Sequence, residues 1–244
     1  MHYTAKKFAK KFFETYVLDK KNLKIIDLGS YSANGDVREI FLESHQYIGL
    51  DLEKGPNVDI VMDNPYKIPF KENSIDIVIS TSCFEHSEMF WLTFNEVQRI
   101  LKPNGLFYLN APSNGPYHTY PVDCYRFYPD SAEALVNWAN FSGFKDVIML
   151  ESFTGKQEKD VWNDFVSIFL KDKKFINEHP NRIINKLDNE FYNGKIHGSN
   201  EIINLTFKTE DQPYENLKYT SHTEYLLYRA INKLFRFVYK FFKK

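Results

Sequence analysis

The stretch that decides the fold is Ile25-Ile26-Asp27-Leu28-Gly29-Ser30, an apolar run that ends in an acid and a glycine. Such a run predicts a buried strand followed by a turn. Ligands of open parallel sheets bind where the strands end, and glycine lets the backbone approach a ligand closely. We therefore expect Asp27 to face a ligand at the end of this strand, where its carboxylate could bind an ammonium group.

A second strand-like run, Tyr47-Ile48-Gly49-Leu50-Asp51-Leu52, ends in an acid roughly twenty residues later. The carboxylate of Asp51 could accept hydrogen bonds from both hydroxyls of a ribose. A third stretch, Asp63-Asn64-Pro65-Tyr66-Lys67-Ile68-Pro69-Phe70, follows another predicted strand. Its acid could accept from the exocyclic amine of an adenine, while a neighbouring backbone N–H faces a ring nitrogen.

Working outward, short apolar runs alternate with helical stretches from Lys24 to about Lys171. This alternation predicts an α/β fold with a mostly parallel sheet and helices on both faces. The segment Lys102–Gly105 indicates a helix end and a tight turn into a strand. Strands are expected at Lys24–Leu28, Gln46–Leu50, Val58–Val61, Ile75–Ser80, Gly105–Ala111, Phe144–Leu150 and Asp164–Leu170, and helices at Asp36–Glu43, Met89–Leu101 and Ser131–Phe141.

The sequence changes character after about Asp172, so we expect a cofactor-binding domain over residues 1–171, with its core at 23–171, and an extension over 172–244. The extension begins with a polar insertion to which we assign no elements. Its last part, Glu224–Lys244, has a helical period, with apolar residues on one face and Lys and Arg on the other. Such a helix suits an anionic membrane surface, or it packs on the domain with its charges in water.

Composition excludes several classes of protein. The formal net charge of −1 provides no global field to attract nucleic acid, so we expect no nucleic-acid partner. Two cysteines, Cys83 and Cys124, are too few for a disulfide framework and suit a reducing cytoplasm. No apolar run is long enough to cross a bilayer, and no Cys/His spacing indicates zinc. We therefore expect a cytoplasmic protein without a bound metal.

Two further segments complete a set of five. These are Ser74-Ile75-Asp76-Ile77-Val78-Ile79-Ser80, which runs on to Phe84-Glu85-His86, and Glu96-Val97-Gln98-Arg99-Ile100-Leu101-Lys102-Pro103-Asn104-Gly105. In order and spacing the five resemble the class I S-adenosylmethionine-dependent methyltransferases with a type-11-like domain, over roughly residues 23–150. The resemblance implies a Rossmann-like sheet of seven strands, mostly parallel with the last strand antiparallel, and a C-terminal helical extension.

The resemblance also implies the cofactor, S-adenosylmethionine, and the residues that bind it. Asp27 and Gly29 would flank its methionine part, Asp51 would hold its ribose, and Asp63 with Asn64 would frame its adenine. Ser80 or Thr81 would lie near the sulfonium. The predicted cofactor-binding set is Asp27, Gly29, Ser30, Asp51, Leu52, Asp63, Asn64 and Ser80.

The chain departs from the family pattern in the glycine loop after Asp27. Tyr31 and Ala33 occupy the positions of the second and third glycines, and Gly35 comes two residues later. A tyrosine there could stack on the cofactor, shield it or narrow the site. The same loss of glycines argues against a dinucleotide, because a pyrophosphate needs that cradle and Asp27 would repel it.

The candidate acceptor-binding segment is Ser113–Asp130, which has no clear period and follows the end of a strand. His118 is the first choice of general base for a hydroxyl acceptor, because histidine titrates near neutral pH. Asp123 could orient His118, and Arg126 could bind a carboxylate or phosphate, with Tyr117 and Tyr125 as aromatic walls. The alternative is that Asp123 and Arg126 form a structural pair that pins the loop, with His118 exposed. His86 is the second candidate for the base.

The residue sequence of this segment resembles that of bacterial methyltransferases found among surface-glycan, or polysaccharide, biosynthesis enzymes. The first hypothesis is therefore an O-methyltransferase acting on a sugar or another polar hydroxyl acceptor, located in the cytoplasm or peripherally at the inner membrane surface. A second hypothesis is methylation of a quinone or other lipid-like small molecule. A third is a catalytically silent methyltransferase fold that binds cofactor or a partner.

Overall fold

The computed structural model describes residues 2–32, 35–41, 45–208, 210 and 227. It divides into two compact units, residues 1–204 and residues 205–244. All helices and strands named below belong to the first unit. The predicted basic helix over Glu224–Lys244 lies outside the described residues except for Leu227.

The first unit is built on one eight-stranded sheet with the order β3-β2-β1-β4-β5-β7-β6-β8. Strands β1 to β5 pair in parallel, whereas β7 is antiparallel to β5 and β6, and β8 is antiparallel to β6. The predicted Rossmann-like, mostly parallel sheet with an antiparallel β7 is confirmed, with one strand more than expected. The strands are β1 Lys24–Leu28, β2 Gln46–Asp51, β3 Ile60–Val61, β4 Ile75–Thr81, β5 Leu101–Pro112, β6 Ile148–Gly155, β7 Asp164–Leu170 and β8 Phe191–Ile196.

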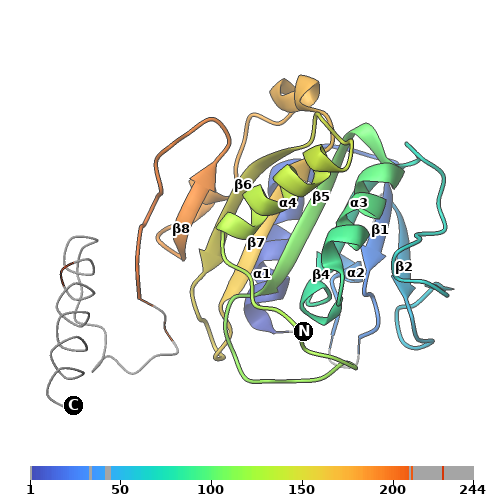
Figure 1. Ribbon diagram of the computed structural model, residues 1–244, viewed down its shortest axis with the longest axis horizontal. Helices are drawn as coiled ribbons and strands as arrows, with labels where there is room; N and C mark the ends of the chain where they lie inside the picture. Colours follow the sequence, from blue (N-terminus) through green and yellow to red (C-terminus); the bar gives the residue numbers. More distant parts are fainter. Residues whose placement is uncertain (1, 33–34, 42–44, 209, 211–226, 228–244) are drawn as a thin grey trace, which may run out of the picture. The chain divides into compact units, whose positions relative to one another are not determined.

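Helices cover both faces of the sheet, α1 and α2 on one and α3 and α4 on the other (Figure 1). Successive strand residues point to opposite faces, so Ile25 packs toward α1 while Ile26 packs toward α3 and α4. Both cores consist mainly of aliphatic and Phe side chains. The helices are α1 Tyr3–Phe12, continued by the π-helix η1 Phe13–Val17, α2 Arg38–Phe41, α3 Phe90–Ile100 and α4 Asp130–Phe141, with short 3-10 helices η2 Phe84–His86, η3 Lys173–Glu178 and η4 Ile184–Lys186.

Helix α1, which the sequence analysis does not predict, forms because its apolar residues recur at helical spacing. Ala5, Phe8, Ala9 and Phe12 are buried against the sheet, and the lysines between them lie on the outer side. The helix therefore belongs to the core of the first unit.

Two predicted boundaries are wrong for identifiable reasons. Strand β5 begins directly at Leu101 without the predicted tight turn, because Leu101 pairs with Ile75 and Leu106 with Ile77. The register shifts there, because the four residues Lys102–Gly105 lie opposite the single residue Asp76. Strand β6 begins at Ile148, after a turn that follows α4.

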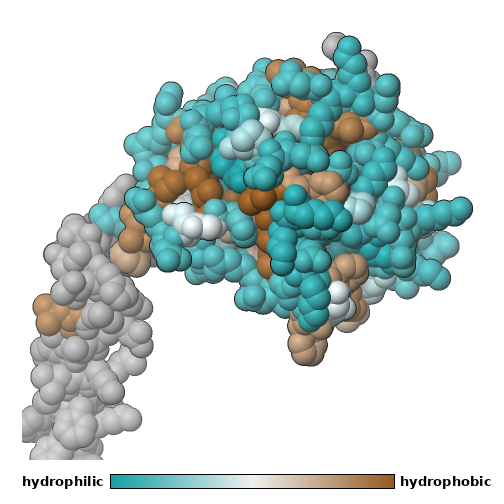
Figure 2. All heavy atoms as spheres, turned by 90° about the horizontal axis from the view of Figure 1, so that it is seen from above, coloured by the Kyte–Doolittle hydropathy of each residue, from teal (hydrophilic) through white to brown (hydrophobic). Residues whose placement is uncertain are grey.

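The surface of the first unit is mostly hydrophilic when seen from above, with hydrophobic residues in separate patches (Figure 2). No helix in the described part of the chain has both the length and the apolar character that spanning a bilayer requires.

The N-terminus and the segment between β5 and α4 lie at the same edge of the sheet (Figure 1). There the His2 ring lies 5.2 Å from the Trp162 ring, and His2 Nε2 lies 3.4 Å from Ser82 Oγ, just after β4. The ends of β1 and β4 are at this edge as well, since both strands run in parallel toward it. This edge therefore brings together the segments that carry the predicted site residues.

Candidate functional site

Asp27 lies near the end of β1 and is almost completely buried. The hydroxyl of Tyr47 donates a hydrogen bond to its Oδ2 at 2.6 Å, and Oδ1 has no hydrogen-bond partner among the described residues. Burial raises the pKa of Asp27 to about 7, although the hydrogen bond from Tyr47 acts in the opposite direction. A cation placed beside Oδ1 would offset this cost of burial.

The turn after β1 can be made only by glycine. Gly29 has a φ of +82°, and a Cβ there would lie 2.5 Å from Cβ of Cys83. The N–H groups of Gly29 and Ser30 both donate to the carbonyl of Leu50, at 2.9 and 3.0 Å. The turn therefore holds the ends of β1, β2 and β4 close together.

Asp51 ends β2, and its carboxylate is held by three backbone N–H groups. Oδ2 accepts from Tyr31 at 2.9 Å, and Oδ1 accepts from Leu52 at 2.7 Å and Glu53 at 3.3 Å. The side chain of Leu52 is exposed. These bonds fix the orientation of the carboxylate at the edge where β1 also ends.

The predicted adenine-framing residues, Asp63 and Asn64, are both exposed in the segment after β3. The side chain of Asn64 accepts a hydrogen bond from the N–H of Tyr66 at 2.8 Å, which closes a local turn. Ser80, by contrast, is fully buried and donates to the carbonyl of Leu28 at 3.0 Å. Its hydroxyl therefore joins β4 to β1 and is not open to solvent.

Tyr31, the departure from the family pattern, packs on the loop that follows β2. A Cβ at Gly55 would lie 2.0 Å from a carbon of the Tyr31 ring, so the ring occupies the space that the missing side chain leaves. Ala33 lies outside the described residues, and Gly35 has a φ of +100°.

In the predicted acceptor segment, Arg126 binds Asp123 through two parallel hydrogen bonds of 2.6 and 2.8 Å. Arg126 also donates to the carbonyl of Pro116 at 2.9 Å, so the pair ties the loop together. The hydrogen bonds from Arg126 hold the pKa of Asp123 well below its usual range. The structural pair that the sequence leaves as an alternative is thus present.

His118 belongs to the same network and is only partly exposed. Its backbone N–H donates to Asp123 Oδ2 at 2.8 Å, and its Nδ1 lies 3.2 Å from the Pro116 carbonyl and 3.4 Å from Asp123 Oδ2. Tyr117 is 79% exposed, whereas the Tyr125 hydroxyl donates to the carbonyl of Glu88 at 2.8 Å. Of the two predicted aromatic walls, Tyr125 is held in place.

His86 meets His118, with 4.9 Å between the ring centroids, and its Nδ1 contacts the carbonyl of Val122. Beside it, Glu85 is fully buried, and neither of its carboxylate oxygens has a hydrogen-bond partner in the described part of the chain. Burial raises the pKa of Glu85 to about 8. Glu85 is not among the predicted site residues, although it stands in the Phe84-Glu85-His86 motif.

Asp164, at the start of β7, is a second buried acid that the sequence analysis does not single out. It is fully buried, burial raises its pKa to about 7, and its Oδ1 lies 3.7 Å from Nδ1 of His2. The sequence signal for it is an acid that begins a mainly apolar strand.

Cys83 connects the two groups of candidate residues. Its side chain lies against Gly29 in the turn after β1, and its carbonyl accepts from the N–H of His86 at 3.0 Å. The predicted cofactor residues of β1 and β2 are therefore neighbours of the predicted acceptor residues.

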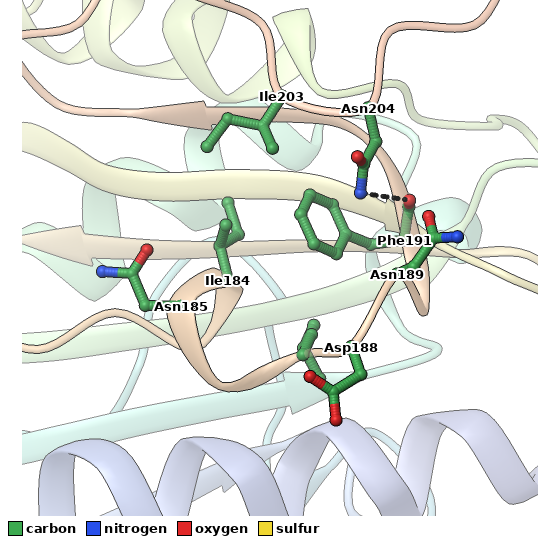
Figure 3. A pocket seen from close by; sticks show the side chains of 8 residues that line it. Ile184, Asn185, Asp188, Asn189, Phe191, Ile203 and Asn204 are labelled. Atoms are coloured by element: carbon green, nitrogen blue, oxygen red, sulfur yellow. Dashed lines mark hydrogen bonds between the residues drawn. The ribbon is translucent and has the colours of Figure 1, made fainter.

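A separate pocket of about 520 Å³ lies elsewhere, between η4 and β8. Ile184, Phe191 and Ile203 line it, together with Asn204, whose side chain donates to the Phe191 carbonyl at 3.3 Å (Figure 3). Strand β8 is at the opposite end of the sheet from β2 and β3. None of the predicted site residues lines this pocket.

The fold is a mostly parallel α/β sheet with acids at or near the ends of β1 and β2. Residues 33–109 match the family described as a methyltransferase domain. Probable S-adenosylmethionine-dependent methyltransferases from two strains of Mycobacterium tuberculosis are each 25% identical over 109 residues, which are 43% of this chain and 40% of theirs. The match thus spans about two fifths of these relatives.

Solved structures show the same fold. A 1,6-didemethyltoxoflavin-N1-methyltransferase from Burkholderia thailandensis, with bound S-adenosylhomocysteine, has a TM-score of 0.53 at 17% identity, over 68% of this chain and 77% of that chain. The [4+2]-cyclase SpnF has a TM-score of 0.50 at 13% identity, over 68% and 81% of the two chains. The chain is therefore similar, over part of its length, to S-adenosylmethionine-dependent methyltransferases, whose cofactor is S-adenosylmethionine, and it shares the fold of these solved structures.

Proposed function

We propose that this protein transfers a methyl group from S-adenosylmethionine to a small polar acceptor. The observation that carries the proposal is the pair of acids at the adjacent ends of β1 and β2, the buried Asp27 and the oriented carboxylate of Asp51. Asp27 would bind the ammonium group of the methionine part, and Asp51 would accept from the ribose hydroxyls. Gly29 and Ser30 would line the methionine, and Leu52, Asp63 and Asn64 the nucleoside.

We propose that the acceptor is a sugar or another hydroxyl compound of surface-glycan biosynthesis, held by Tyr117, Tyr125 and Arg126. Methyl transfer from a sulfonium is an in-line displacement, so positioning supplies much of the rate. A hydroxyl must also lose its proton as the bond forms, which makes a general base useful. His118 is the first candidate, oriented through Nδ1 by the Pro116 carbonyl and Asp123, and His86 is the second.

The surroundings of Ser80 restrict the part that it could play in binding the cofactor. Its hydroxyl is buried and bonded to Leu28, so a contribution near the sulfonium would act through the position of β4.

Calorimetric titration with S-adenosylmethionine and S-adenosylhomocysteine tests the cofactor. We expect micromolar binding that Asp51→Ala sharply weakens, because the bidentate contact to the ribose is lost. Asp188→Ala, at an exposed acid beside the pocket near β8, is the matched control and should bind normally. Near-normal affinity in Asp51→Ala would contradict the ribose role. No binding to the unaltered protein at millimolar ligand would favour a catalytically silent fold.

Turnover with a panel of sugars and quinones tests the acceptor. We expect His118→Ala to lower turnover much more than cofactor affinity, and His197→Ala, at an exposed histidine outside the site, to leave both unchanged. An unchanged rate at neutral pH would remove His118 as base. Turnover on quinones but not on sugars would favour the lipid-like acceptor, for which the abundance of aromatic residues is the main support.

We also propose peripheral contact with the inner, cytoplasmic membrane surface through Glu224–Lys244. The support is the sequence pattern of apolar and basic residues. Sedimentation with anionic liposomes should retain the full chain and lose the protein shortened by residues 224–244. Equal sedimentation of both forms would refute the contact.

A further inference from the structure

Three residues beside the acceptor segment form a set of metal-binding side chains. One potential ligand atom from each of Glu85, His86 and His118 lies within 4.8 Å of the other two. Two imidazoles and one carboxylate are a donor set that divalent transition metals bind, Zn²⁺ and Fe²⁺ among them. We propose that Glu85, His86 and His118 bind one divalent transition-metal ion.

The hydrogen bonds of His86 leave the correct nitrogen for a metal. Its Nδ1 contacts the carbonyl of Val122, which can only accept, so Nδ1 carries the proton. The lone pair is then on Nε2, which lies 3.7 Å from Oε1 of Glu85. A metal-binding histidine usually donates its other N–H to a carbonyl or carboxylate in this way.

His118 is oriented by the same kind of contact. Its Nδ1 faces the Pro116 carbonyl at 3.2 Å and Asp123 Oδ2 at 3.4 Å, so the proton is placed on Nδ1 and Nε2 is left as the ligand atom. Asp123 is itself fixed by the two hydrogen bonds from Arg126. A carboxylate behind the imidazole raises its basicity as a ligand.

Glu85 supplies the third ligand and the observation that most needs an explanation. It is fully buried, and neither carboxylate oxygen has a hydrogen-bond partner among the residues that the structure describes. Buried charges in proteins are paired or coordinate a metal, because an isolated buried carboxylate is costly. A cation between Glu85 and the two histidines would supply the missing partner.

The inference goes beyond the proposed methyl transfer and does not depend on it. An ion at this position would lie beside the predicted acceptor segment, where it could bind a hydroxyl and lower its pKa. Nε2 of His118 cannot then serve as a free base, so the ligand role and the base role of His118 exclude each other. The ion would take over the activation of the hydroxyl.

Metal titration of the full chain tests the site directly. The protein is prepared without a histidine tag, stripped with a chelator and titrated with ZnCl₂ by calorimetry and with CoCl₂ by visible absorption. We expect one ion per chain at micromolar or tighter affinity, weakened at least about tenfold in Glu85→Gln and in His118→Ala. His197→Ala and Cys124→Ser, which remove an exposed histidine and the exposed thiol, should bind as the unaltered protein does.

Thermal unfolding and S-adenosylhomocysteine titration of the same samples show whether each variant is folded. Metal binding that is equally tight in Glu85→Gln and His118→Ala, or that is absent from the unaltered protein, would overturn the inference. Metal binding without cofactor binding would instead contradict the proposed function and leave the metal site standing.

Discussion

Tyr47 on β2 donates a hydrogen bond to Asp27 on β1, with 2.6 Å between the hydroxyl and Oδ2. Both side chains are almost completely buried. Tyr47 pairs with Ile25 across the two strands, and Asp27 comes two residues after Ile25, so Tyr47 and Asp27 lie on the same face of the sheet. Among the described residues, the Tyr47 hydroxyl is the one hydrogen-bond partner of this carboxylate. Tyr47 therefore holds the acid that we assign to the cofactor.

Tyr47→Phe should lower the free energy of unfolding by about 1–3 kcal/mol, because it leaves a buried carboxylate without its hydrogen bond. It should also weaken cofactor binding, since the orientation of Asp27 is lost. Urea unfolding and calorimetry measure the two effects.

Tyr66→Phe is the control for this substitution. The Tyr66 hydroxyl accepts an exposed hydrogen bond of 3.3 Å from the N–H of Met89, so its loss should change stability by no more than about 0.5 kcal/mol. Equal stability of Tyr47→Phe and the unaltered protein would show that the bond between Tyr47 and Asp27 contributes nothing.

Stability should depend on pH through Asp27, whose pKa is about 7 in the fold against 3.8 without it. Between these values the folded state holds a proton that the unfolded state has lost. The free energy of unfolding should therefore fall as pH rises from about 4 to 7, by about 1.4 kcal/mol per unit for this group. Urea unfolding at several pH values measures the slope.

Asp27→Asn isolates this contribution, since the amide cannot ionise and its oxygen still accepts from Tyr47. Between pH 5 and pH 6.5, the free energy of unfolding of the variant should therefore fall less steeply than that of the unaltered protein. The difference in slope should correspond to about one proton. Identical slopes in the variant and the unaltered protein would mean that Asp27 titrates near its ordinary pKa.

The parts of the fold that the sequence predicts are those whose signal is local. The apolar run Lys24–Leu28 is β1 with the expected boundaries, because its residues are buried on both faces of a parallel sheet. Strand β8 has no such signal, since an Asn-Gly pair interrupts Phe191–Ile196 and the strand is defined by pairing with β6. Helix α1 has a local signal, since Phe8 and Phe12 recur at helical spacing, although no helix is predicted there.

The candidate site divides in the same way. The positions of Asp27 and Asp51 can be predicted, because Asp27 is the last residue but one of β1, Asp51 is the last of β2, and parallel strands end at a common edge. The proximity of Glu85 and His118 cannot be predicted from the sequence, because it depends on how the segment after β5 folds back over η2. A search for metal sites by short Cys/His spacing does not find such a set.

Arg126→Met should lower the free energy of unfolding by about 2–3 kcal/mol, because it leaves the buried carboxylate of Asp123 without its partner. Adding Asp123→Asn should recover part of the loss, and a double-mutant cycle with urea unfolding measures the coupling. Lys173→Met, in an exposed pair with Asp146, should cost no more than about 1 kcal/mol. Strictly additive effects at Asp123 and Arg126 would show that the pair does not pin the loop.

Gly29→Ala should be strongly destabilising at the cofactor edge. A φ of +82° costs an alanine about 1–2 kcal/mol, and the new Cβ would also lie 2.5 Å from Cβ of Cys83. The clash should add about 1–3 kcal/mol and push β4 away from the turn, which weakens cofactor binding. Gly143→Ala separates the two causes, because Gly143 has a φ of +106° but nothing within 4 Å of its would-be Cβ. If urea unfolding gives the same loss for both variants, the close contact between Gly29 and Cys83 plays no part in holding this edge together.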